Sequence, residues 1–186
     1  MGDVRNGGRP RRFGSVSARA ERGAAAVEFA LVLPLLLAVV FGIINFGFVM
    51  SQKAALSNAA RAGARYATVN AYSGTHTCQS VVDKVRAEAL TLGIGDGNKN
   101  QVAVDVTFTD QATGVAATVC STSAGSASVS FGGASLPCRN TSGSPSAPDQ
   151  LAVTGRFESP LPVPTPGLGS SVTLTGSSSF VCEYYE

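Results

Sequence analysis

The longest apolar stretch of the sequence runs over residues 29–50 and contains no charged side chain. As an α-helix, these 22 residues would extend roughly 33 Å, close to the thickness of the hydrocarbon core of a bilayer. A helix that is apolar on every side is not stable against water, and a core helix of this length would need a larger protein around it. The pattern therefore predicts one membrane-spanning helix.

The helical pattern continues beyond the apolar stretch, because residues 51–69 are rich in alanine and contain no proline. Small and apolar side chains recur along one face of this segment, at Leu56, Ala59, Ala60, Gly63 and Ala67. Arg61 and Arg65 lie on another face. We expect one helix from about Ala25 to Thr68, with a half in lipid and a half packed on an outer domain.

The rest of the chain alternates between a second helix and several strands. An apolar stripe over residues 78–92 predicts the helix, and Gly93 can end it. Alternation of apolar and polar residues predicts strands at 102–108, 115–119, 127–131, 151–157, 171–177 and 179–185. Glycine, serine and proline predict a long loop at 132–149, and four prolines predict a turn or crossover at 159–170. The fold class is α+β, with an antiparallel sheet.

Charge is distributed unevenly along the chain. Residues 1–23 hold six arginines and two acidic residues, a net charge of +4, whereas the remainder carries a net charge of −2. The positive-inside rule then keeps the N-terminus cytoplasmic and places the C-terminal part outside the cytoplasm, in a single pass of the cell membrane. The expected organisation is a basic leader at 1–23, a transmembrane helix at 24–53 and an extracytoplasmic α+β domain at 54–186. The folded part offers no basic surface for nucleic acid.

All four cysteines follow the apolar stretch, at Cys78, Cys120, Cys138 and Cys182. They form no C-x-x-C pair, and His76 is the only histidine, which argues against a zinc site. An even number of cysteines outside the cytoplasm indicates two disulfides. Three connectivities are open. The preferred one joins Cys120 to Cys138 as a local clamp, and Cys78 to Cys182 as a tie between the second helix and the last strand.

The residues before the apolar stretch discriminate between kinds of N-terminal segment. A secretory signal has a shorter apolar region followed directly by a small-residue cleavage site, and neither is present here. The Arg11-Arg12 pair lies too far upstream of Phe29 for a twin-arginine signal. A plain signal anchor stays open. The junction itself is Arg22-Gly23-Ala24-Ala25-Ala26-Val27-Glu28-Phe29.

This junction resembles the cleavage motif of prepilins, and specifically that of the TadE-like family, the minor pseudopilins of tight-adherence (Flp-type) pili. The similarity continues through the apolar stretch and the alanine-rich segment as far as Ala67. It implies a pilin-like fold, whose outer domain the two expected disulfides would stabilise. It also implies pilus assembly and adhesion as the function, with other pilin-like subunits, an assembly platform, a prepilin peptidase and the lipid bilayer as partners, and the pilus as a further location.

The resemblance also assigns roles to individual residues. It implies cleavage between Gly23 and Ala24, where glycine leaves an extended backbone unobstructed in a protease cleft. It further implies that Glu28, followed by Phe29, pairs with the free N-terminal amine of a neighbouring subunit, which exists only after cleavage. A carboxylate at the edge of the bilayer costs several kcal/mol unless it is paired. The alternative role for Glu28 is a position in the headgroup region.

Motifs for catalysis, metals and cofactors are weak. His76 and Cys78 would need a free thiol to act together. The glycine-rich segment 93–97 has neither the dinucleotide-binding nor the P-loop spacing. Asp96, Asn98, Asn100 and Asp105 suggest calcium only weakly. The first three match the start of a calcium loop, but Gln101 occupies its glycine position and Thr107 its closing glutamate position. We expect no enzyme, no metal and no cofactor. An uncleaved, signal-anchored extracellular binding module is the alternative to a pseudopilin.

Overall fold

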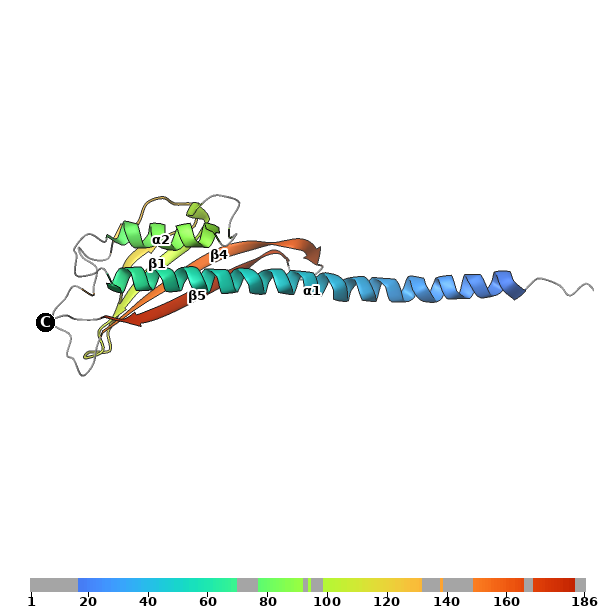
Figure 1. The fold of residues 1–186 in the computed structure, drawn as a ribbon. Coiled ribbons are helices and arrows are strands. Elements are labelled where there is room, and N and C mark those ends of the chain that lie inside the picture. The colour runs from blue at the N-terminus through green and yellow to red at the C-terminus, as the bar shows by residue number, and fades with distance from the viewer. Residues whose placement is uncertain are drawn as a thin grey trace, which may run out of the picture. The chain divides into compact units, whose positions relative to one another are not determined.

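The computed structural model describes residues 17–69, 77–91, 94, 99–131, 138, 149–165 and 169–182. Helix α1 spans Ser17–Val69, α2 spans Cys78–Thr91, and a short 3-10 helix, η2, spans Lys99–Gln101. The strands are β1 (Ala103–Thr109), β2 (Ala116–Thr122), β3 (Ser130–Phe131), β4 (Gln150–Thr165) and β5 (Gly169–Val181). Figure 1 shows these elements. The expected α+β class is confirmed, with a long N-terminal helix, a second helix and an antiparallel sheet.

The strands form one antiparallel sheet in the order β3-β2-β1-β4-β5. Burial alternates along β4, where Leu151, Val153 and Phe157 are buried and the intervening side chains are more exposed. The second half of α1 and helix α2 lie beside each other and cover one face of the sheet (Figure 1). The core between the helices and this face includes Leu56 and Val85. It belongs to a compact unit that begins at Gly42; residues 1–41 form a second unit.

Most of the expected elements are present, and several differ in extent. Helix α1 begins at Ser17 and not near Ala25, and the strand expected at 127–131 is reduced to Ser130–Phe131. The segments 171–177 and 179–185 were expected as separate strands, but β5 runs continuously from Gly169 to Val181. The proline-rich segment at 159–170 was expected as a turn, but β4 continues to Thr165. Strand β1 pairs with β4 only as far as Arg156. Beyond that residue no other described strand pairs with that edge of β4, and an edge strand is where a sheet tolerates proline.

Two glycines face each other in the sheet beneath α1. Gly155 of β4 is directly opposite Gly176 of β5, and both lie under the turn of α1 that carries Leu56. A Cβ atom on Gly176 would lie 2.6 Å from the backbone nitrogen of Ser57 and 2.7 Å from the carbonyl carbon of Leu56. The helix backbone therefore rests directly on the sheet at this point, and only glycine allows this approach.

A Gly176→Ala substitution is expected to lower the free energy of unfolding by about 2 kcal/mol, because the helix and the sheet must separate to accept the methyl group. The matched control is Gly155→Ala, whose Cβ would approach only the flexible end of the Leu56 side chain, at 2.9 Å. Urea unfolding of the full chain in detergent micelles measures both. Equal losses for the two variants would contradict the close backbone approach.

One buried arginine joins α2 to the sheet. The Arg86 side chain is fully buried, and its Nε donates a hydrogen bond to the carbonyl oxygen of Val102 at 3.0 Å. Its Nη2 donates to Thr122 Oγ1 at 3.0 Å and to the carbonyl oxygen of Ser123 at 3.3 Å. Its Nη1 donates to Asn100 Oδ1 at 3.3 Å. The guanidinium thus satisfies acceptors on η2, β2 and the residues that follow each of them.

Burial lowers the pKa of the Arg86 guanidinium from its ordinary value, and the nearby charge of Asp83 partly opposes this effect. An arginine nevertheless stays protonated in a protein.

An Arg86→Met variant is expected to lose about 2–3 kcal/mol of unfolding free energy, because it leaves buried hydrogen-bond acceptors without a donor. The control Lys84→Met removes a cation from the exposed side of the same helix and is expected to change little. Denaturant unfolding compares the two, and equal losses would contradict a special role for Arg86.

The disulfide pairing differs from the expected one. The structure joins Cys78 to Cys120, with 5.8 Å between their Cα atoms, and Cys138 to Cys182, with 5.3 Å. The expected pairs, Cys120 with Cys138 and Cys78 with Cys182, are therefore wrong. The first turn of α2 lies against β2, where Cys78 Sγ also contacts the carbonyl oxygen of Val119. The end of β5 lies near residue 149, whose carbonyl oxygen accepts a hydrogen bond from the Cys182 amide, and Cys182 bonds to Cys138 there.

Candidate processing and assembly site

The predicted cleavage junction lies inside α1. Gly23 is exposed, and a Cβ atom added to it would meet no other atom within 4 Å. The structure therefore gives this position no steric reason to be glycine. The backbone here is helical, whereas a protease needs an extended one. Glycine in a helix interior costs about 1 kcal/mol relative to alanine, which makes local unwinding easier at this point.

Glu28 and Phe29 lie on α1 just after the junction, and both side chains are exposed, Phe29 by 65%. Within the described part of the chain, Glu28 has no hydrogen-bond or ion-pair partner. Ala24 precedes Glu28 by four residues, which is about one helical turn or 6 Å. The nitrogen that cleavage would release at Ala24 thus lies on the same side of the helix as the carboxylate.

After Phe29, the helix exposes apolar side chains in every direction. The large exposed ones between the junction and the folded unit include Leu31, Leu35, Leu36 and Val39. Within the described residues, α1 is the one helix long and apolar enough to cross a membrane, and its most apolar window has no buried residue. This fits a single-pass membrane anchor.

Two amide side chains mark the place where α1 meets the folded unit, and the sequence analysis did not single them out. Asn45 Nδ2 donates a hydrogen bond to the carbonyl oxygen of Val163 at 2.8 Å, and the Val163 amide donates to Asn45 Oδ1 at 3.2 Å. Seven residues further along, Gln52 Oε1 accepts a hydrogen bond from Ser159 Oγ. Asn45 and Gln52 are both buried. The sequence did hold a signal for Asn45, because it is a polar amide within the apolar stretch 29–50.

These contacts fasten the closed end of the β4–β5 hairpin to the middle of α1 (Figure 1). Asn45 satisfies both backbone groups of Val163, as a neighbouring strand would. We call this region the exit collar; it comprises α1 residues 43–52 and β4 residues 159–165. The later turns of the segment expected to span the membrane, 24–53, are therefore covered on one side by the hairpin.

The residues considered for catalysis and metal binding have other partners where the structure describes them. Cys78 is in a disulfide, so it cannot act as a nucleophile. Asp105 forms an ion pair with Arg156, and Asn100 accepts a hydrogen bond from Arg86. The described residues contain no group of three His, Cys, Asp or Glu side chains that could hold a metal ion. His76, Asp96 and Asn98 lie outside the described residues.

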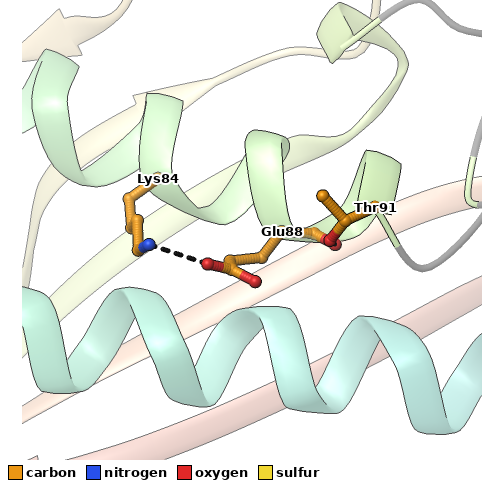
Figure 2. Close-up of polar contacts among 3 residues, drawn as sticks. All are labelled: Lys84, Glu88 and Thr91. Atoms are coloured by element: carbon orange, nitrogen blue, oxygen red, sulfur yellow. Dashed lines mark hydrogen bonds and ion pairs between the residues drawn. The ribbon is translucent and has the colours of Figure 1, made fainter.

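Polar contacts along α2 join partly exposed side chains. Figure 2 shows Lys84 Nζ and Glu88 Oε1, which are 2.7 Å apart, with Thr91 one turn further along. The Thr91 hydroxyl donates to the carbonyl oxygen of Glu88 at 2.7 Å. An exposed pair four residues apart contributes only about 0.3–0.5 kcal/mol. This group stabilises the end of the helix slightly and provides no site for chemistry.

Comparison with known proteins points to the same segment of the helix. Neither the curated proteins nor the solved structures include a match to this chain. One family model matches, described as TadE-like protein, over residues 23–65. The matched segment begins at the predicted cleavage residue and covers the apolar and alanine-rich parts of α1. The resemblance drawn from the sequence is thus confirmed over these residues: α1 carries a TadE-like segment, which indicates a role related to the tight-adherence pilus.

Proposed function

We propose that this protein is a minor pseudopilin that is anchored in the cell membrane and takes part in assembling a tight-adherence pilus. The observation that carries the proposal is the junction at 23–29. An exposed glycine precedes an exposed glutamate by about one and a half helical turns, directly before a helix whose apolar side chains have no cover. The match of residues 23–65 to the TadE-like model supports it.

Processing between Gly23 and Ala24 by a prepilin peptidase explains the charges at the junction. Cleavage removes the basic leader and creates a positively charged amine on Ala24. Glu28 then gains a candidate partner in the amine of a neighbouring subunit. Pairing lowers the cost of holding a carboxylate at the edge of the bilayer. Assembly would in this way depend on processing.

The basic leader also sets the orientation that the proposal requires. A leader charge of +4 holds the N-terminus, and the bond to be cut, at the cytoplasmic face. The α+β unit then lies outside the cytoplasm, where its two disulfides are stable. Other pilin-like subunits would contact α1, and the assembly platform in the membrane would receive the processed protein.

A Glu28→Gln variant is expected to insert into the membrane normally but to associate with other subunits at least about tenfold less, since losing one desolvated charge pair costs more than about 1.4 kcal/mol. The change keeps the size of the side chain and removes only its charge. Cross-linking of two differently tagged copies in native membranes measures the association. Glu158→Gln, which changes an exposed carboxylate on β4, is the matched control.

The same substitution can be tested in a chain that is not cleaved and therefore keeps residues 1–23. In a chain that carries Gly23→Leu, the Ala24 nitrogen stays in a peptide bond and has no charge. Glu28→Gln should then have no further effect on association. Equal effects of Glu28→Gln with and without processing would show that the carboxylate acts through some other group than the new amine.

A further inference from the structure

In both chain segments of the exit collar, charged residues end at the same position along the helix axis, beside the contact between Gln52 and Ser159. On α1, Lys53 directly follows Gln52, and residues 29–52 contain no charge. On β4, Glu158 directly precedes Ser159, and residues 159–182 contain no charge. The contact between Gln52 and Ser159 places the two boundaries beside each other. Beyond this contact, towards Asn45, neither segment presents a charged side chain.

The uncharged collar exposes apolar surface. On the helix, Ile43, Ile44, Phe46, Phe48 and Met50 are exposed, Phe46 by 67%. On the hairpin, Pro160 and Pro162 are exposed. Leaving such surface in water costs about 25 cal/mol for each Å². The apolar surface is continuous along α1 with the residues that fit a membrane span.

The backbone of the hairpin tip is suited to a medium poor in water. In the distal part of β4, no strand among the described residues pairs with the edge that does not face β5. An unpaired N–H group there would cost several kcal/mol in lipid. Pro160 and Pro162 have no N–H group. The N–H and carbonyl groups of Val163 both bond to the Asn45 side chain.

Lengths along α1 agree with a bilayer. From Ala24 to Asn45 the helix rises about 32 Å, close to the hydrocarbon thickness of about 30 Å. From Asn45 to Gln52 it rises about 10 Å, which matches the 5–10 Å zone in which amphipathic elements lie at the headgroup and acyl boundary. The side-chain hydrogen bonds between the distal part of β4 and α1 come from the two ends of this second interval, Asn45 and Gln52.

We propose that the exit collar is a membrane-docking surface, seated in the headgroup and acyl boundary of the leaflet that faces the folded unit. Residues 160–163 of β4 and the exposed face of α1 residues 45–50 contact lipid at this boundary, and residues 24–44 cross the hydrocarbon core. The collar fixes the depth of α1 and holds the folded unit close to the membrane. This inference rests on the proposed membrane anchoring.

Tryptophan fluorescence tests the collar, because the chain contains no tryptophan. Three single variants of the full chain, Pro162→Trp, Leu36→Trp and Thr175→Trp, are placed in phosphatidylcholine–phosphatidylglycerol vesicles. Bromine near the carboxyl end of the acyl chains should lower the emission of Pro162→Trp to about half, since that depth is the boundary zone. Leu36→Trp should respond most to bromine near the methyl end, and Thr175→Trp to neither.

Each alternative outcome has its own signature. Quenching of Leu36→Trp without quenching of Pro162→Trp overturns the collar and leaves the anchor intact. No quenching of Leu36→Trp overturns the membrane anchoring itself. A blue shift of Pro162→Trp that depends on the protein-to-lipid ratio, without quenching, shows that a second copy covers the collar instead. Leu161→Trp, with an intact disulfide pattern as the check of folding, repeats the test if Pro162→Trp fails to fold.

Discussion

Protein isolated from membranes of cells expressing Gly23→Leu is expected to retain residues 1–23. Cleavage should slow by roughly 100-fold or more, since forcing leucine into a site shaped for glycine costs about 3 kcal/mol or more. The position is exposed, and an added Cβ atom would meet no other atom within 4 Å. A loss of processing would therefore report recognition by the peptidase. Mass spectrometry of the purified chain measures the retained fraction.

Two variants serve as controls for this result. Gly14→Leu makes the same change elsewhere in the leader and should be processed at the normal rate. Gly23→Ala adds one methyl group and should be slowed less than Gly23→Leu, although both raise the helix propensity of α1. Equal slowing by alanine and leucine would indicate that unwinding of the helix, and not the fit of residue 23, limits cleavage. Full processing of Gly23→Leu would contradict the assigned site.

The second large effect concerns the disulfide that joins α2 to β2. Replacing both Cys78 and Cys120 with alanine should lower the unfolding free energy by about 4 kcal/mol, from the loop-closure entropy expected for a sequence separation of 42. This is a large share of the about 5–15 kcal/mol that stabilises an ordinary domain. Urea unfolding of the full chain in micelles, with the wild type as reference, measures it. A loss below about 1 kcal/mol would contradict a structural role.

The pairing itself is tested by a second double cysteine variant, Cys78→Ala with Cys182→Ala. With the pairs found in the structure, this change breaks both disulfides and leaves Cys120 and Cys138 as free thiols. With the pairing expected from the sequence, it removes one disulfide and leaves no free thiol. Thiol titration under denaturing conditions separates the two. The variant lacking Cys78 and Cys120 should show no free thiol in the same assay.

The helices were predictable because their signals are local. The apolar stretch and the alanine-rich continuation predicted α1 and its C-terminal end, although the helix begins at Ser17 and not near Ala25. The stripe that includes Val81, Val85 and Ala89 predicted α2. Side chains at this spacing must share one face of a helix. The junction at Gly23 was also a local motif, and the match of residues 23–65 to the TadE-like model coincides with it.

The long-range contacts were not predictable in the same way. The connectivity of four cysteines depends on which segments meet in space, and Cys78 meets Cys120 only because α2 crosses to β2. The sequence analysis did not single out Arg86, whose buried hydrogen bonds go to acceptors far along the chain. Gly176, in an otherwise regular strand, did carry a signal, since such a glycine often marks the close approach of another backbone.

The central claim is that this chain is processed at the start of its membrane helix and assembles through the end that processing creates. The most direct measurement is the N-terminal sequence and intact mass of the wild-type protein purified from the membrane fraction of cells that hold the prepilin peptidase. The account predicts a chain that begins at Ala24. A membrane protein that retains residues 1–23 in those cells would contradict it and would favour an uncleaved, signal-anchored binding module.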